Sequence, residues 1–354
     1  MEIVDPRNDP EAWDRCISDF PDASFFHSSA WARVLCRAYG HQPFYLRFNG
    51  KLGDAHALVP LMEVRSPITG RRGIGLPFSD FCQPLIRDPA EPDLATLHVA
   101  LANFARDRNW KYLELRGAAP DSLGLTEKPP TFLGHQLDLR VGSETLLAGC
   151  SSSVRRALRK ATRAQLSASI GHSESAMREF YRLHCLTRRR HGLPPQPYRF
   201  FQIIHEELIR QRSGFIVLAS RAGSEQPIAA AIFLNFNGQA VYKFGASDER
   251  EWELRPNNLV MWEGIRHLAE SGAAQLHFGR TSPGQDGLRR FKLSWGSREE
   301  AIRYHQFETR SRDWQPVCPS ASHGLASRLG HKLFNIAPLA INRLAGQLLY
   351  PHLD

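Results

Sequence analysis

The stretch that decides the fold is residues 255–296, RPNNLVMWEGIRHLAESGAAQLHFGRTSPGQDGLRRFKLSWG. Its first part predicts a helix over 257–270, because Pro256 stands at the start and Gly272 lies just past the end. A short buried strand over 276–278 follows after a tight connection. The segment therefore encodes a helix that leads directly into a strand, which is the building unit of an α/β sheet.

The same unit occurs earlier in the chain. LANFARDRNWKYLELR (101–116) and GIRHLAESGAAQLHFGR (264–280) each read as a helix, a tight connection and a strand that ends in arginine. This repetition indicates a duplication. We expect an α/β protein with mixed sheets and two tandem domains, at 1–145 and 146–310, followed by an amphipathic helical tail at 311–354.

Capping residues and turn signals place the remaining elements between these units. Asn237-Gly238 is the strongest hairpin signal, between apolar runs at 228–236 and 239–244. Further helices are predicted at 10–20, 28–39, 94–108, 151–165, 175–191 and 200–210. Further strands are predicted at 44–48, 55–64, 73–77, 112–115, 133–139, 215–220 and 301–307, and 314–322 reads as a loop.

The composition of the 354 residues, 42% hydrophobic and 23% charged, is typical of a soluble globular protein. No apolar run approaches the ~18 residues that cross a bilayer, and the N-terminus lacks the pattern of a signal peptide. We therefore expect a cytoplasmic protein. The six cysteines form no C-x-x-C pair, and the fifteen histidines show no metal-ligand spacing, so no metal site is predicted.

Positive charge is concentrated in one segment of a chain whose net charge is +9. No acidic residue occurs from 145 to 173, whereas Arg155, Arg156, Arg159, Lys160 and Arg163 fall within nine positions. A charge run is usually a solvated helix face, but five like charges without an acid favour an anionic partner. A nucleotide-sugar diphosphate, a lipid-linked diphosphate and tRNA all fit, whereas no motif for sequence-specific DNA binding is present.

The segment LASRLGHKLFNIAPLAINRLAGQLLY (325–350) has an amphipathic helical pattern broken at Pro338. Such a basic tail packs on its own protein or on a second subunit, or lies peripherally on the inner face of a membrane. The pattern alone leaves these alternatives open.

Several blocks resemble the bacterial FemAB/CelD-type acyltransferases, which have a duplicated GNAT fold. The matching pieces are GLPFSDFCQPL (75–85), RRALRKATR (155–163), YKFGASD (242–248) and LHFGRTSPGQDGLRRFKLSWGSREEAIRY (276–304). The resemblance implies two tandem GNAT-like domains and an N-acyltransferase. It also implies transfer of an acyl group, with acetyl-CoA as a donor, to an amine of a cell-envelope or exopolysaccharide precursor.

One departure from the GNAT pattern concerns the donor. GNAT enzymes hold the pyrophosphate of acetyl-CoA with a [QR]-x-x-G-x-[GA] turn that opens a helix. The corresponding residues 250–258 read REWELRPNN and contain no glycine. The branch of the family that uses aminoacyl-tRNA also lacks this turn. An aminoacyl-tRNA-dependent peptidyltransferase of FemABX type, or an inactive GNAT pair that binds an anionic polymer, are therefore the alternatives.

Three residues are predicted to carry the chemistry. The resemblance implies that Lys292, in the F-K-x-x-W-G block, faces the reacting carbonyl or the donor phosphate, where its ammonium would stabilise negative charge. Arg280 ends a strand at the sheet edge where ligands bind in α/β proteins, or braces the loop through a carboxylate such as Asp286. Asp80, in a loop among aromatic residues, is the candidate base if desolvation raises its pKa, or is a turn aspartate.

Residues around these positions are predicted to bind the substrate or the donor. Strand alternation lets only one of Tyr242 and Lys243 face the presumed channel. No Ser-His-Asp or Cys-His pattern is apparent, so a direct attack by the amine is the simpler mechanism. The predicted binding residues are Phe291, Trp295, Tyr242, Trp262, Asn257, Arg155, Arg159, Lys160 and Arg163.

Overall fold

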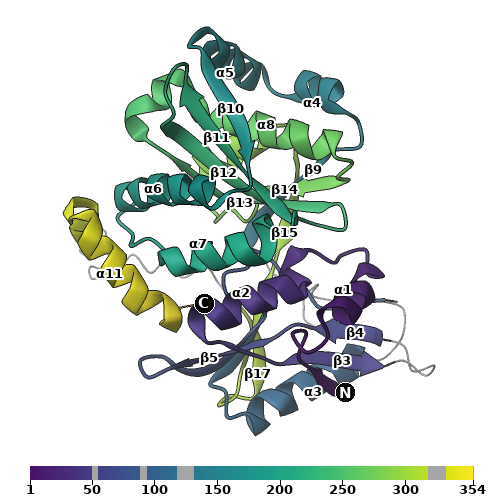
Figure 1. Ribbon diagram of the computed structural model, residues 1–354. Helices are drawn as coiled ribbons and strands as arrows, with labels where there is room; N and C mark the ends of the chain where they lie inside the picture. Colours follow the sequence, from purple (N-terminus) through teal and green to yellow (C-terminus); the bar gives the residue numbers. More distant parts are fainter. Residues whose placement is uncertain (50–54, 88–93, 118–130, 318–331, 354) are drawn as a thin grey trace.

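The computed structural model describes residues 1–49, 55–87, 94–117, 131–317 and 332–353. Figure 1 shows two halves, one above the other, with helix α11 along one side. Both halves combine helices with mixed sheets, as the sequence predicts.

The first half is built on two sheets, in the orders β1-β3-β4-β7 and β17-β16-β8-β6-β5-β2. The oxygen of Ser28 caps helix α2 by accepting from Trp31 N at 3.2 Å, and Gly40 ends the helix with a φ of 72°. The helices are α1 (Pro10–Ser18), η1 (Phe25–His27), α2 (Ser29–Tyr39) and α3 (Leu94–Asp107). The strands are β1 (Glu2–Val4), β2 (Gln42–Pro43), β3 (Tyr45–Asn49), β4 (Ala55–Val59), β5 (Met62–Ser66), β6 (Gly70–Ile74), β7 (Leu85–Ile86) and β8 (Tyr112–Arg116).

The second half is built on one sheet in the order β10-β11-β12-β13-β14-β9-β15. Its strands are β9 (Phe132–Asp138), β10 (Leu166–Gly171), β11 (Gly214–Arg221), β12 (Pro227–Phe236), β13 (Gln239–Ser247), β14 (Gln275–His277) and β15 (Arg298–Ile302). Its helices are α4 (Ser143–Gly149), α5 (Ser152–Arg163), α6 (Glu174–Arg190), α7 (Tyr198–Ile204), the π-helical η3 (His205–Ile209), η4 (Glu249–Leu254), α8 (Pro256–Glu270) and α9 (Asp286–Leu293).

Strand β12 shows how the central sheet divides its side chains between two cores. Ile232 and Leu234 lie in the core that α6 covers. Phe233 lies in the core that α8 covers, which we call the second core. This alternation places α6 and α8 on opposite faces of the sheet. The turn that joins β12 to β13 has positive φ at Asn237 (48°) and Gly238 (78°), so the predicted hairpin is confirmed.

The sheets interleave along the chain. Strand β9, which precedes the predicted boundary at 145, pairs with β14 and β15 in the sheet of the second half. Conversely, β16 (Tyr304–Glu308) pairs with β8 in the first half and with β17 (Asp313–Pro316). The division into domains at 1–145 and 146–310 stays a prediction, because strands from both ranges pair in the two larger sheets.

Two segments predicted as single strands are each divided between two sheets. Residues 55–64 break after Val59, at Pro60, and continue as β5 in the other sheet. Residues 301–307 break at Arg303, between β15 and β16. The loop predicted at 314–322 begins instead as β17, and its residues from 318 lie outside the described residues. Periodicity detects the extended backbone but not the change of sheet.

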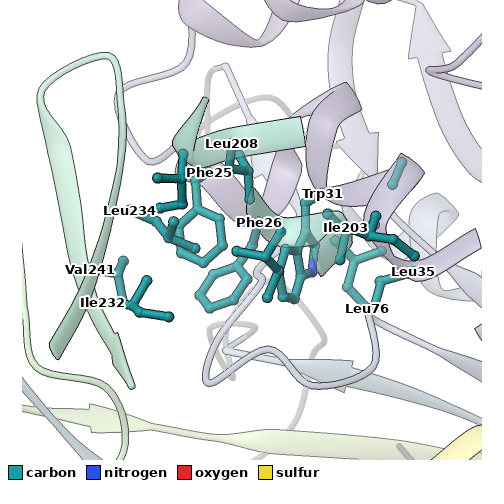
Figure 2. Close-up of a cluster of buried hydrophobic side chains, with 14 of the residues drawn as sticks. Phe25, Phe26, Trp31, Leu35, Leu76, Ile203, Leu208, Ile232, Leu234 and Val241 are labelled. Carbon is teal, nitrogen blue, oxygen red and sulfur yellow. The ribbon is translucent and has the colours of Figure 1, made fainter. Parts of the chain in front are cut away.

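One hydrophobic core joins the two halves. Figure 2 shows Phe25, Phe26, Trp31 and Leu35 of the first half packed against residues of the second half. All of the labelled side chains are at most 3% exposed, and burying a side chain of this size contributes about 1.5–3 kcal/mol. The labelled partners from the second half are Ile203, Leu208, Ile232, Leu234 and Val241.

The C-terminal segment is helical on both sides of Pro338, where the sequence predicts the break. Residues 332–336 are helical, and α11 (Leu339–Leu349) begins after Pro338 and ends in η5 (Tyr350–His352). The backbone of α11 lies close to the loop after α6, because a Cβ on Gly346 would come within 1.9 Å of the Pro195 carbonyl oxygen. Only glycine permits this approach.

Candidate functional site

A loop of the first half, residues 75–81, reaches the strand ends of the second half. Leu76 and Phe78 both have positive φ, 57° and 59°, which is strained for residues with a Cβ. Cations and a hydroxyl from other elements hold the loop: Lys243 Nζ donates to the Phe78 carbonyl at 2.7 Å, and Tyr304 Oη donates to the Asp80 carbonyl at 2.8 Å. The strained backbone therefore fixes the position of Asp80.

The Asp80 carboxylate lies among three cations. Lys243 Nζ is 3.2 Å from Oδ2, and Arg280 Nε is 3.9 Å from Oδ1. Burial acts to raise the pKa of Asp80, but the charges of Lys243, Arg280 and Lys292 lower it below its ordinary value. We call Asp80, Lys243, Arg280 and Lys292 the charge cluster. The condition set for Asp80 to act as a base, a pKa raised by desolvation, is therefore not met, because these cations favour the ionised carboxylate.

Lys292 is the most deeply buried member of the charge cluster, 3% exposed. Its Nζ donates to the carbonyls of Gly279 and Arg280, both at 2.9 Å, so it holds the turn after β14. Burial lowers the pKa of Lys292 to about 8, and the charge of Asp80 acts in the opposite direction. The ammonium lines none of the cavities described below. Its predicted contact with a reacting carbonyl therefore stays a prediction, and the observed geometry is that of a positioning residue.

Arg280 is predicted to end the strand, but β14 ends at His277, three residues earlier, and Arg280 contacts the first half from the turn that follows. Its Nη1 donates to Tyr304 Oη at 2.8 Å, and its guanidinium lies 4.4 Å from the centre of the Phe132 ring. The carboxylate beside it is Asp80 rather than Asp286. The side chain remains 38% exposed, so an incoming ligand can reach it.

Strands β13 and β14 separate near the charge cluster. Their parallel pairing ends at Val241 and His277, whereas β13 continues to Ser247. The register of β12 and β13 shifts so that Lys243 has no partner on β12, which indicates a bulge at this residue. Lys243 turns toward Asp80, whereas Tyr242 packs on the second core, where burial raises its pKa to about 12. Only one of these neighbours faces the site, as alternation predicts.

A cavity of about 470 Å³ lies at the N-terminus of α8, between α5 and α9. We call it the donor pocket, after the acyl donor that we propose for it below. Its lining contains four cations and no carboxylate: Arg156, Lys160, Arg255 and Arg290. At the N-cap of α8, Arg255 has the left-handed conformation (φ 64°, ψ 37°). The backbone thus makes a turn at the position where the GNAT motif has glycine, although the residue is an arginine.

Of the predicted binding residues, Lys160 and Phe291 line the donor pocket. Asn257 does not, but its neighbour Asn258 does. Trp295 lies in the second core at 1% exposure, with its ring 6.0 Å from that of Phe291, and lines none of the cavities described here. Sequence reasoning missed Arg255, Asn258 and Arg290 as pocket residues, although the missing glycine turn pointed to this helix N-terminus.

A second cavity, of about 550 Å³, lies between α5 and α8. We call it the arginine groove. Arg155, Arg159 and Arg163 line it together with Trp262, so four of the predicted binding residues do meet in space. The lining shares no residue with the donor pocket. Within the described ranges, no group of histidine, cysteine and acidic side chains could hold a metal ion.

Comparison with known proteins places this geometry in a fold family. Residues 148–293 match the model of the acetyltransferase (GNAT) domain family. No curated protein matches the sequence. Among solved structures, FemX is similar over 85% of this chain and 94% of its own, with 14% identity and a TM-score of 0.65. L-PGS from Bacillus licheniformis is similar over 93% and 98%, with 11% identity and a TM-score of 0.54.

A tandem GNAT protein from the clavulanic acid biosynthesis pathway is similar over 87% of this chain and 97% of its own, with 11% identity and a TM-score of 0.52. The molecule thus has the duplicated GNAT fold, which confirms the resemblance to the FemAB/CelD-type acyltransferases. Residues 148–293 therefore form an acetyltransferase (GNAT) domain.

Proposed function

We propose that the protein is an N-acyltransferase that takes its acyl group from acyl-CoA and transfers it to an amine of a cell-envelope or exopolysaccharide precursor. The observation that carries the choice of donor is the donor pocket. Four cations without a lining carboxylate surround the N-terminus of α8, where backbone N–H groups and the helix dipole also favour phosphate. The diphosphate and ribose phosphate of CoA supply that negative charge.

In the proposed reaction a neutral amine attacks the thioester carbonyl directly. The C–N bond forms, the C–S bond breaks, the thiolate leaves, and the amine loses one proton to a base or to water. Cys150, three positions before the first residue that lines the donor pocket, does not suit an acyl-enzyme, because burial raises its pKa to about 11 and keeps it a thiol. Asp80 stays ionised and a fifth exposed, so we propose that it orients the incoming amine.

An aminoacyl-tRNA donor is the second candidate. One observation favours it. The turn at the start of α8 carries the side chains of Arg255 and Asn258, whereas the corresponding CoA-binding turn of GNAT enzymes carries glycine. A tRNA end would also supply phosphates to the same cations. The two donors differ in size, so binding measurements separate them.

The donor is tested by titrating the protein with acetyl-CoA, with CoA and with charged tRNA. We expect acetyl-CoA to bind, and Arg255→Glu to weaken it by about tenfold or more, because a charge-assisted hydrogen bond is worth about 1.5–3 kcal/mol. The matched control is Arg140→Glu, at an exposed arginine outside the donor pocket. Binding of charged tRNA alone, lost in Arg255→Glu, would establish the second candidate instead.

We also propose that the tail contacts an anionic membrane surface. No acidic residue occurs from Trp314 to Leu353, and five aliphatic side chains there are 56–82% exposed: Leu333, Ile336, Ile341, Leu344 and Leu348. Ile341, Leu344 and Leu348 follow one outer face of α11. No helix among the described residues is long and apolar enough to span a bilayer.

Sedimentation with vesicles tests this contact. We expect the protein to pellet with anionic vesicles and less with neutral ones, and Leu344→Glu to reduce the bound fraction at unchanged acetyl-CoA binding. A tail that instead pairs two copies would show a concentration-dependent dimer, abolished by the same substitution, and no vesicle binding.

A further inference from the structure

Helix α5 presents cations on two neighbouring faces. Arg156 and Lys160 line the donor pocket, whereas Arg155, Arg159 and Arg163 line the arginine groove. The second set recurs every four residues, so it follows one side of the helix. The groove is therefore a separate concave surface, and the donor pocket does not account for its charges.

The cations of the arginine groove are not neutralised by the protein. In the part of the chain that the structure describes, no carboxylate pairs with Arg159 or Arg163, and both are exposed. The one acid of the lining, Glu263, pairs with Arg266 outside it. Arg155 is fixed by donating to the carbonyls of Ala148 and Cys150. The arginine groove therefore carries a net positive charge, and one of its guanidinium groups, that of Arg155, is held in place by the backbone.

The floor of the groove is apolar. Leu158, Leu259 and Trp262 line it and pack, half-buried, on the second core. Leu147 lines one end. A volume of about 550 Å³ lies within the range of small-molecule sites, ~300–1,000 Å³. A ligand that satisfies both parts needs an anionic group for the arginines and a hydrocarbon portion for the floor.

We propose that the arginine groove binds an anionic amphiphile, a phosphate or diphosphate group attached to a hydrocarbon chain. The three arginines hold the phosphate, and the chain lies along Leu158, Leu259 and Trp262. A nucleic acid would use the same cations but would leave the leucines uncovered. Because the groove and the donor pocket share no residue, the proposal holds whichever donor the enzyme uses.

Decyl phosphate, below its micelle-forming concentration, is the probe. Calorimetric titration is expected to show binding to the wild-type protein, at least tenfold tighter than inorganic phosphate and than decyl maltoside. The first comparison measures the hydrocarbon contribution and the second the charge. Equal affinity for decyl phosphate and inorganic phosphate would mean a free-anion site and would overturn the proposal.

Two substitutions on the same helix are the matched pair. Arg159→Glu is expected to weaken decyl phosphate about tenfold or more and to leave acetyl-CoA binding unchanged, since one charge-assisted contact is lost. Arg156→Glu changes the face that also carries Lys160. It is expected to weaken acetyl-CoA binding and to leave the affinity for decyl phosphate unchanged. Equal effects of both variants on both ligands would show that only the overall charge matters, and the proposal would fail.

Trp262→Leu tests the floor without removing a hydrophobic side chain from the core. It is expected to weaken decyl phosphate severalfold at unchanged affinity for inorganic phosphate. Charged tRNA that competes with decyl phosphate and is insensitive to Trp262→Leu would identify the groove as a nucleic-acid surface and refute the amphiphile.

Discussion

Replacing Lys292 by methionine removes an ammonium that is 3% exposed and that donates to two carbonyls, those of Gly279 and Arg280. Methionine occupies a similar volume without the charge. The substitution leaves two carbonyls unpaired, at roughly 1–3 kcal/mol each. It also abolishes the cost of burying the charge, which is the cost that lowers the pKa of Lys292 to about 8.

This buried charge makes stability depend on pH with a definite sign. From pH 8 to 10.5 the unfolded chain binds more protons at this lysine than the folded protein does, because the ordinary pKa is 10.5. The free energy of unfolding of the wild type therefore rises with pH in this window relative to Lys292→Met. The full effect of the shift corresponds to about 3 kcal/mol. Below pH 8 the free energies of unfolding of the wild type and of Lys292→Met differ by an amount that does not change with pH.

Urea unfolding followed by fluorescence at pH 7, 8, 9 and 10 measures this difference. We expect the wild type to gain about 2–3 kcal/mol over Lys292→Met from pH 7 to 10. Lys160→Met, which removes an exposed lysine, is the control and is expected to stay close to the wild type throughout. A difference that is constant with pH, or that falls, would refute the assignment of a buried ammonium at this position.

Two further substitutions test other contacts of the structure. Asp80→Asn leaves the Lys243 ammonium buried without its carboxylate and should cost about 3 kcal/mol at pH 7 in urea unfolding. Because the folded pKa of Asp80 is lowered, its stabilisation is fully present above the ordinary pKa of 3.8 and is lost as the pH falls through the lower folded pKa, so the difference between variant and wild type should shrink as the pH falls below 3.8. Gly346→Ala would bring a Cβ within 1.9 Å of the Pro195 carbonyl oxygen. It should loosen α11 and speed proteolysis of the tail, and an unchanged digestion rate would contradict the close approach.

Local signals in the sequence were sufficient for many elements of the fold. Helix α8 begins at Pro256 and ends just before Gly272, as predicted, and Asn237-Gly238 forms the predicted hairpin. These features depend on residues within one turn of the backbone. The divided strands at 55–64 and 301–307 could not be predicted in this way, because the choice of sheet depends on partners far along the chain. Thus β16 pairs with β8, roughly two hundred residues earlier.

The candidate site was predictable as a set of residues but not as an arrangement. Helical periodicity predicts the line of Arg155, Arg159 and Arg163 on α5, but the division of the five cations of this helix between two cavities depends on where α8 and α9 lie. In the sequence Lys243 stands out only as the neighbour of Tyr242. Its ion pair with Asp80 joins residues 163 positions apart, and nothing in either local sequence specifies the other.

The charge cluster links the two halves of the molecule. Loop 75–81 of the first half is held by Lys243 and Tyr304, and the turn after β14 is held by Lys292. Separating the halves would expose the shared core and leave buried cations without Asp80, and breaking such a pair alone costs about 3–5 kcal/mol. The turn at 279–280 is therefore positioned jointly by both halves. This coupling gives a physical reason for keeping the first half, although the donor pocket is built entirely from the second.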